Sequence, residues 1–288
     1  MSTIKEWLKV INNQTKVIFA ILIFVAIIPN VIPISLPIII TQPTQDFYDT
    51  IKNLPEGSTV MVGHGYSSGN WGELGGGVIA VHNQLIQLGD KHFKVILTPL
   101  ESIDGALLIQ RVLGLQIGGK DALGKYGVDW VFLGYVPGQE TAYANMLSEP
   151  DGMHTTWGNK DYYGTDMKNL PIMDNILDHR DIDLFIYMTA AGPMHAVRQF
   201  GVPYQIPILS VDIGVDWPEA KMAYDNRALK GALKSTVAAS EYEKLLSLPG
   251  LASSTVGGLS FNHLLIIGFI ILGNIQYFLG RRKKEGGK

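Results

Sequence analysis

The sequence predicts an α/β protein: a three-layer, doubly wound and mainly parallel sheet of about five strands, flanked by two transmembrane helices. Three observations lead to this prediction. Short β-branched runs alternate with helical patterns through the middle of the chain, and two long uncharged apolar segments lie near its ends. Cationic residues lie on the terminal side of both segments, which is typical of helices that cross a membrane.

The candidate strands are continuous apolar runs, as expected when helices cover both faces of a sheet. They lie at 59–62, 93–98, 130–134, 184–188 and 206–211. Helical patterns lie at 73–88, 103–115, 140–147 and 193–200, and a long one extends over 218–246. Strands that alternate with helices indicate βαβ units with right-handed crossovers, and therefore a parallel sheet.

The first apolar segment is long enough to cross a bilayer. Residues 17–45 carry no charge, and a hydrocarbon core of about 30 Å needs about 20 apolar residues in a helix. We expect a transmembrane helix over 17–41, preceded by a short amphipathic cytoplasmic lead over 1–16. A cleaved signal peptide is the alternative, but its apolar core is shorter and ends at a small-residue cleavage site. Here the segment instead contains Pro29, Pro33 and Pro37.

The second apolar segment predicts another transmembrane helix, over 262–280, which follows a linker over 249–261 and precedes a basic tail over 281–288. Lys and Arg near a span stay on the cytoplasmic side. The flanking cations are Lys5, Lys9, Lys16, Arg281, Arg282, Lys283 and Lys284. We therefore expect a two-pass protein of the cell membrane, with both termini cytoplasmic and an extracytoplasmic Rossmann-like domain over 42–248.

Composition excludes several classes of function. The net charge of −3 argues against a nucleic-acid partner. The chain has no cysteine, which excludes disulfides, thiol catalysis and zinc–thiolate sites. Its seven histidines form no H-x-H or H-x-x-x-H pair, so we predict no metal site and no cofactor. The carboxylate-rich stretch 178–183 leads directly into a strand, and we expect it to be a solvated turn.

The glycine-rich turn after the first strand is the clearest candidate for ligand contact. Gly63 and Gly65 fit the dinucleotide fingerprint G-x-G-x-x-G, but Ser68 stands in place of its third glycine. Ligands of open parallel sheets bind at the carboxyl ends of the strands, where the strand order reverses. The candidate ligand-binding residues in these loops are Ser67, Ser68, Asn70, Tyr135, Thr189 and Asp212. A purely structural set of turns is the alternative, because such turns are rich in Gly, Pro and Asp.

One nucleophilic constellation can be assembled, from Ser67 or Ser68 with His195 and Asp212. Residues 65–69 match the spacing of the G-x-S-x-G nucleophile elbow. The elbow, however, requires a helix that begins at once, and Asn-Trp-Gly intervenes here. We therefore assign no catalytic residue.

The stretch 148–178 is too long for a simple βαβ connection, and loops of this length are often functional or bind partners. Its aromatic side chains are candidate partner contacts, because aromatic residues are enriched in protein interfaces. These residues are Trp157, Tyr162 and Tyr163.

Four blocks of sequence, at 134–138, 161–165, 170–173 and 241–246, resemble an uncharacterised prokaryotic membrane protein family. That family has an N-terminal anchor and a Rossmann-like extracytoplasmic domain. The resemblance implies the same architecture and contributes no activity and no catalytic residue.

The double anchor favours a structural role, because it fixes the domain at the membrane surface. We expect a scaffold subunit of a larger membrane complex, whose partners are the lipid bilayer and other membrane subunits, including further copies of itself. A membrane-anchored small-molecule-binding or sensory module is the alternative. A hydrolase-like enzyme is a second alternative.

Overall fold

The computed structural model describes residues 16, 18–24, 27 and 38–285. Residues 38–252 form one compact unit, which is the α/β domain, and the residues on either side of it form a second unit. The predicted cytoplasmic lead and most of the predicted first transmembrane helix lie outside the described residues.

The sheet of the domain has six strands, all parallel, in the order β3-β2-β1-β4-β5-β6. They are β1 (Thr59–Gly65), β2 (Lys94–Pro99), β3 (Trp130–Phe132), β4 (Leu184–Thr189), β5 (Ile208–Asp212) and β6 (Gly231–Lys234). The α/β class and the five expected strands are confirmed, and β6 is an additional strand. The strand order reverses between β1 and β4, which are neighbours in the sheet.

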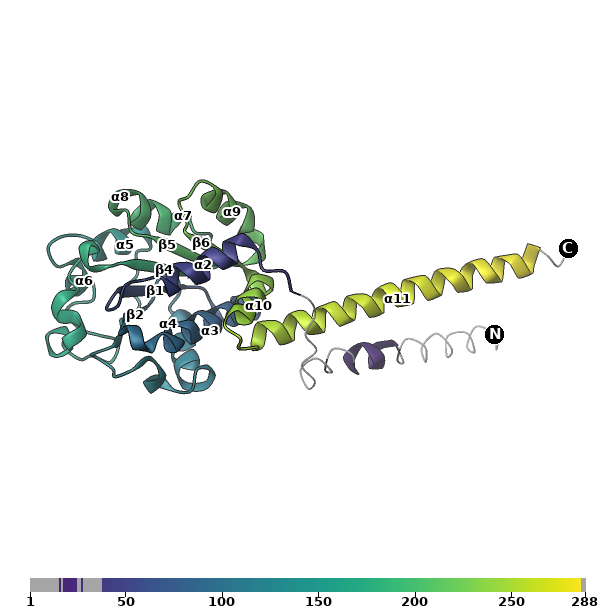
Figure 1. Ribbon diagram of the computed structural model, residues 1–288, viewed down its shortest axis with the longest axis horizontal. Helices are drawn as coiled ribbons and strands as arrows, with labels where there is room; N and C mark the ends of the chain where they lie inside the picture. The colour runs from purple at the N-terminus through teal and green to yellow at the C-terminus, as the bar shows by residue number, and fades with distance from the viewer. Residues whose placement is uncertain (1–15, 17, 25–26, 28–37, 286–288) are drawn as a thin grey trace. The chain divides into compact units, whose positions relative to one another are not determined.

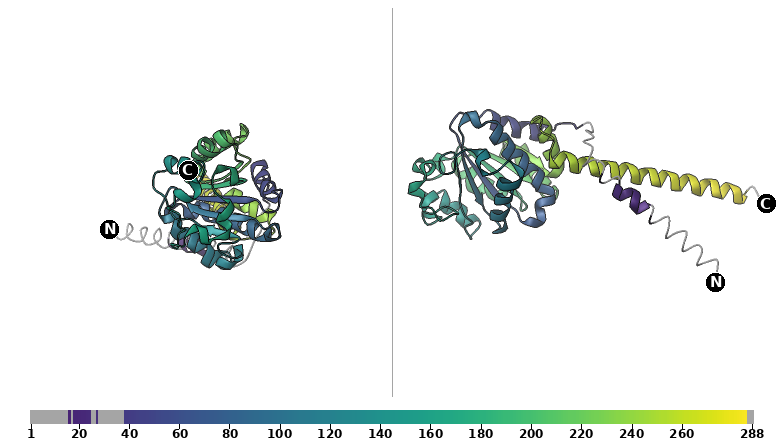
Figure 2. Two further views of the ribbon diagram at one scale, coloured as in Figure 1. Left: turned by 90° about the vertical axis from the view of Figure 1, so that its left-hand side faces the viewer. Right: turned by 90° about the horizontal axis from the view of Figure 1, so that it is seen from below.

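Helices cover both faces of the sheet, so the domain has three layers (Figures 1 and 2). One face packs against α2 (Gln42–Lys52), α3 (Trp71–Gln87), α4 (Asp104–Arg111) and α10 (Ser235–Leu245). The other packs against α5 (Glu140–Met146), α6 (Gly152–Thr155), α7 (Met194–Ala196) and α9 (Trp217–Asp225). Strand residues alternate between the two cores, because successive side chains of a strand point to opposite faces. Thus Val60 and Val62 lie in one core and Met61 in the other.

Short helical turns connect these elements. They are η1 (Ser68–Asn70), η2 (Gly89–Lys91), η3 (Val112–Gln116), η4 (Lys120–Leu123), η5 (Met167–Asn169), η6 (Pro171–Asn175), η7 (His179–Asp181), η8 (Val197–Gly201), α8 (Val202–Tyr204) and η9 (Gly214–Asp216). Of these, η3 and η8 are π-helical continuations of α4 and α7.

The prediction of one long helix over 218–246 is wrong. The chain leaves α9 at Arg227, whose φ of 63° is left-handed, and then forms β6 before α10 begins. A Cβ on Gly231 would lie 2.4 Å from the Cα of Phe47, so only glycine lets α2 lie this close to β6. The strand is short and contains good helix formers, which is why its local sequence resembles a helix.

The C-terminal helix α11 (Leu251–Glu285) has 35 residues and is about 50 Å long at 1.5 Å per residue. Its part from Leu251 to Ile271 is the one helix among the described residues that is long and apolar enough to cross a membrane. The helix begins where the sequence predicts a linker over 249–261, and it includes the predicted second span. The two-pass topology remains a prediction.

Both ends of the α/β domain are held by α10. The backbone N–H and hydroxyl of Thr41 donate to Glu241 Oε2 at 2.8 and 2.7 Å, and Lys244 Nζ donates to the Ile38 carbonyl at 2.8 Å. The backbone N–H groups of Gly250 and Ala252 both donate to the buried Glu243 carboxylate at 2.9 Å. The chain therefore enters and leaves the domain at the same helix.

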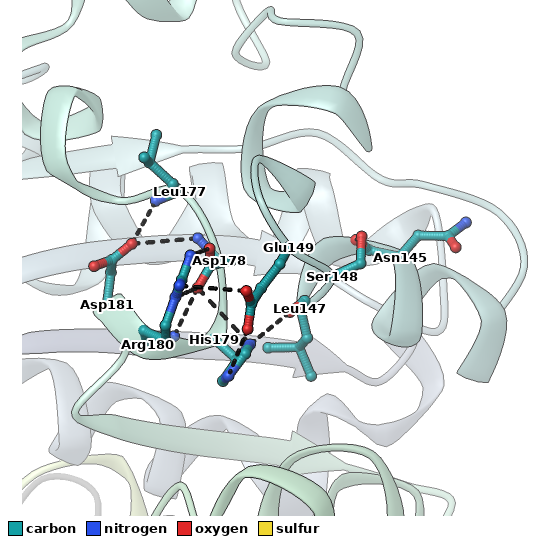
Figure 3. Close-up of polar contacts among 9 residues, drawn as sticks. All are labelled: Asn145, Leu147, Ser148, Glu149, Leu177, Asp178, His179, Arg180 and Asp181. Atoms are coloured by element: carbon teal, nitrogen blue, oxygen red, sulfur yellow. Dashed lines mark hydrogen bonds and ion pairs between the residues drawn. The ribbon is translucent and has the colours of Figure 1, made fainter.

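The stretch 178–183 is not the solvated turn that the sequence predicts, because Asp178 is fully buried (Figure 3). Its carboxylate accepts hydrogen bonds from Arg180 Nε at 2.8 Å and Nη2 at 2.5 Å, and Arg180 lowers the pKa of Asp178. Arg180 also pairs with Glu149 at 3.3 Å, and His179 Nδ1 hydrogen-bonds to the Leu147 carbonyl at 2.9 Å. This cluster ties the start of the insertion over 148–178 to its end.

Two buried histidines face each other between β1 and α3. The rings of His64 and His82 are 5.4 Å apart, and both side chains are fully buried. Nδ1 of His64 contacts the Tyr66 hydroxyl at 3.0 Å and Nδ1 of His82 contacts the Val78 carbonyl at 2.8 Å, while neither Nε2 has a partner among the described residues. Burial lowers the pKa of both imidazoles, that of His82 to about 4.

Asp178→Ala is expected to lower the free energy of unfolding by about 1–3 kcal/mol, because it removes the acceptor of three hydrogen bonds from Arg180. Urea unfolding of the full chain in detergent measures this loss. Asp166→Ala is the control, since its ion pair with Lys168 is more exposed and is expected to contribute at most about 1 kcal/mol. Equal losses in the two variants would contradict a structural role for Asp178.

The buried histidines predict loss of stability in mild acid. The unfolded chain takes up protons below pH 6.5, whereas folded His82 stays neutral down to about pH 4, which costs about 3 kcal/mol across that interval. Unfolding free energies of the full chain at pH 7, 6 and 5 test this, and His82→Gln is expected to flatten the decline. His92→Gln, at an exposed position, serves as control and should keep the wild-type slope.

Candidate functional site

Five polar side chains, four of them buried and one partly buried, gather at the carboxyl ends of the central strands. Tyr187 and Thr189 lie on β4, Ser210 and Asp212 lie on β5, and Glu101 follows β2. All five lie close to the point where the strand order reverses, which is where ligands of doubly wound sheets bind. The structure therefore places these polar residues at the edge of the sheet where a ligand is expected, but their side chains hydrogen-bond to one another.

The Glu101 carboxylate fills the space that the glycine-rich turn leaves open. A Cβ on Gly65 would lie 3.0 Å from Glu101 Oε2. The Tyr187 hydroxyl donates a short hydrogen bond to Glu101 Oε1, and Thr189 Oγ1 donates to Oε2 at 3.3 Å. In dinucleotide-binding folds such a glycine admits the pyrophosphate. Here a carboxylate of the same chain occupies that position.

The environment of Glu101 shifts the pKa of its carboxyl upward. Burial raises the pKa of the carboxyl, while the hydrogen bond from Tyr187 and the nearby His195 oppose that shift. Sequence reasoning missed this residue. The available signal was an acidic side chain two positions beyond the end of β2, the place where dinucleotide folds carry a ribose-binding carboxylate.

The six candidate ligand-binding residues do not surround one pocket. Ser67 Oγ donates to Asn70 Oδ1 at 2.9 Å, and Ser68 Oγ donates to Asp104 Oδ2 at 3.4 Å, so these three residues stabilise the turn that leads into α3. Thr189 contacts Glu101 and accepts a hydrogen bond from the Ala191 N–H at 2.9 Å.

Asp212 is fully buried on β5 and accepts a short hydrogen bond from Ser210. Its Oδ1 has no partner among the described residues. Burial raises the pKa of Asp212 well above its usual range, and the nearby Asp216 and Glu219 raise it further. Burial thus favours the neutral form of this carboxyl over the charged one.

The residues of the considered serine–histidine–aspartate constellation hydrogen-bond to other groups. His195 Nδ1 hydrogen-bonds to Glu140 Oε1 at 2.5 Å, and Arg198 Nη2 donates to the same oxygen at 2.7 Å. Arg198 and then His195 lower the pKa of Glu140 to about 2. Asp212 contacts Ser210 instead of an imidazole. These pairings do not favour the hydrolase alternative.

A pocket of about 800 Å³ lies at the carboxyl ends of β2 and β3. Its walls come from the start of α4, the loop after β3 and the insertion over 148–178. The lining residues include Ile103, Asp104, Leu107, Tyr135, Val136, Trp157, Lys160, Asp161 and Tyr162. One candidate ligand-binding residue, Tyr135, and two candidate partner contacts, Trp157 and Tyr162, thus share one pocket. The third candidate partner contact, Tyr163, packs against Tyr162 and is 54% exposed.

Hydrogen bonds to the sheet and to the loop after β3 hold the aromatic wall of the pocket. Trp157 Nε1 donates a short hydrogen bond to the Gly134 carbonyl. The Tyr162 N–H donates to the Phe132 carbonyl at 2.9 Å, and the Tyr162 ring stacks on Phe132 with centroids 4.3 Å apart. Because Phe132 belongs to β3, the sheet itself fixes where the insertion runs.

Within the described part of the chain, no group of three or more His, Asp or Glu side chains is arranged to hold a metal ion. No protein-family model, curated protein or solved structure matches the chain. The resemblance to a prokaryotic membrane protein family is therefore not confirmed, and the functional argument rests on the pocket and its surroundings.

Proposed function

We propose that this protein is a membrane-anchored binding module, whose α/β domain holds a small organic molecule in the pocket lined by Tyr135, Trp157 and Tyr162. The pocket carries the proposal. Its volume of about 800 Å³ falls in the range of roughly 300–1,000 Å³ typical of small-molecule sites. Its lining is mostly apolar and aromatic with a few charged groups, which is also typical of such sites.

Contacts within the domain hold the walls of the pocket. The Trp157 and Tyr162 side chains are fixed by the contacts to Gly134 and Phe132 described above. At the other end of the insertion, Arg180 pairs with Glu149 and so joins the end of the loop to its start. A site whose walls are already ordered loses less conformational entropy on binding, and this supports a binding role for the insertion.

The proposal includes attachment to the cell membrane through two helices, with both termini cytoplasmic. The apolar length of α11 supports the second attachment. The clamps on α10 support a paired arrangement, since Glu241 holds the start of the domain and Glu243 holds its end. A sensory role follows naturally, because a ligand-binding domain fixed at both ends can transmit its state to the segments that flank it.

A scaffold role for the same surface is the second candidate. Ile103 and Leu107, at the start of α4, are 70% and 66% exposed, and Tyr163 beside the pocket is 54% exposed. Exposed apolar side chains around a cavity are typical of surfaces that bind another protein. Another membrane subunit or a second copy of this chain would cover them. Native mass spectrometry of the full chain in detergent separates the two candidates, because a lone monomer argues against the scaffold role.

The binding proposal predicts that Trp157→Ala abolishes ligand-induced stabilisation. Thermal-shift screening of the full chain in detergent, with nucleotides, sugars, organic acids and amines, is expected to find a compound that stabilises the wild type. A ligand at 100 times its Kd stabilises by about 2.7 kcal/mol. Trp217→Ala is the control, because Trp217 lies below Lys234 and does not line the pocket. Stabilisation that survives in the Trp157→Ala variant would place the ligand elsewhere.

The topology can be tested by cysteine labelling, because the chain has no native cysteine. Single cysteines are introduced as Ser2→Cys, Lys168→Cys and Gly287→Cys. A membrane-impermeant maleimide is expected to label only the Lys168→Cys variant in intact cells, and all three after permeabilisation. Labelling of exactly one tail in intact cells would show termini on opposite sides and would exclude the two-pass arrangement.

A further inference from the structure

We propose that the pocket selects an organic cation, of the quaternary or tertiary ammonium class, that carries an apolar substituent. This inference rests on the proposed binding function and names the class of ligand. Two features of the pocket support it: a buried carboxylate without a cationic partner, and three aromatic side chains.

Asp161 supplies the buried negative charge. It lines the pocket and is only 6% exposed. Its carboxylate accepts hydrogen bonds from the Tyr126 hydroxyl at 2.5 Å and the Thr165 N–H at 2.7 Å, both of which are neutral donors. No ion pair joins Asp161 to a lysine, arginine or histidine in the described part of the chain. Buried charges are normally paired, so a cation in the pocket would complete this site.

The charges around the pocket favour a positive ligand. Asp104 lines it together with Asp161, and Lys160 is the one basic residue among the lining residues. Lys160 also interacts with a carboxylate outside the pocket. Lys168, and to a lesser extent Lys160, lower the pKa of Asp166, which does not line the pocket. Two carboxylates, Asp104 and Asp161, would repel an anionic ligand. A cationic ligand would be attracted by both and repelled by Lys160 alone.

The aromatic side chains favour an ammonium group with at most one N–H donor of its own. Tyr135, Trp157 and Tyr162 line the same pocket, and the faces of such rings attract quaternary ammonium groups through their quadrupoles. The Trp157 N–H already donates to Gly134, so it has no hydrogen bond left for a ligand.

The size of the pocket requires more than a small ammonium group. Its volume of about 800 Å³ exceeds that of one methylated nitrogen, and the exposed aliphatic side chains of Ile103 and Leu107 form part of its wall. An apolar substituent on the ligand would cover them. Both a free metabolite and a lipid headgroup with a quaternary nitrogen have this chemistry, so the experiment must separate the two sources.

The test compares ligands that differ only in charge. The full chain in maltoside detergent is titrated with choline, with benzyltrimethylammonium, and with 3,3-dimethylbutanol, which is the neutral carbon analogue of choline. Tryptophan fluorescence and thermal shift report binding. The two ammonium probes are expected to bind about five- to thirtyfold more tightly than the neutral analogue, as a cation–π contribution of about 1–2 kcal/mol implies.

A second experiment compares nanodiscs of phosphatidylcholine with nanodiscs of phosphatidylglycerol. Stabilisation by phosphatidylcholine alone assigns the lipid headgroup as the source.

Matched variants connect the selectivity to the pocket. Asp161→Asn keeps the shape and the acceptor oxygen but removes the charge, and it is expected to weaken ammonium binding about tenfold without changing binding of the neutral analogue. Asp104→Asn is a second variant with the same expectation, for use if the first does not fold. Asp166→Asn is the control outside the pocket and should bind as the wild type does.

Two results would overturn the inference. If the neutral analogue or an organic acid bound as well as the ammonium probes, the pocket would still be a ligand site but not one for cations. If none of the compounds bound and the screen described above found no stabiliser, the binding function itself would fail as well.

Discussion

The carboxylate of Glu101, lying against Gly65 at the end of β1, is the contact on which the functional part of this structure depends. Parallel sheets with the order 3-2-1-4-5-6 bind their ligands at this reversal point, because the loops diverge there and leave a crevice. In this chain the crevice contains Glu101, with Tyr187 and Thr189 hydrogen-bonded to it. The strand order is that of the dinucleotide-binding fold, but the Glu101 side chain lies against Gly65 at the end of β1.

Occupation of the reversal point shifts the available binding surface toward the β3 edge of the sheet. The loop after β3 and the insertion over 148–178 build a new pocket there, with Trp157 and Tyr162 as its aromatic wall. The insertion contacts the sheet through Phe132, and its two ends are joined by the Arg180–Glu149 ion pair. These contacts order a long loop, against the loss of its conformational entropy, and make it one wall of the pocket.

The α/β class could be predicted from the sequence because the apolar runs that mark the strands are local features of the chain. Each buried strand is a continuous apolar run, and five of the six were found in this way. The sixth was missed because Gly231, Ala232 and Leu233 form a strand by pairing with β5 and by packing beside Phe47, which lies 184 positions earlier in the chain. The pocket was missed for the same reason: Tyr135 and Trp157 were both singled out, but only the bond from Trp157 to Gly134 brings them together. Residues 178–183 were misjudged because burial of Asp178 depends on an insertion whose path cannot be read from its composition.

The position of the pocket also bears on where its ligand comes from. The pocket adjoins β3, which is one edge of the sheet, whereas both ends of the domain are clamped by α10, which packs beside β6 at the opposite edge. Five strand spacings of about 4.8 Å separate these edges, a distance of about 24 Å. A lipid headgroup that reached the pocket would have to lie that far from the points where the flanking segments join the domain. Within the proposed ammonium class, this separation favours a dissolved molecule over a membrane lipid.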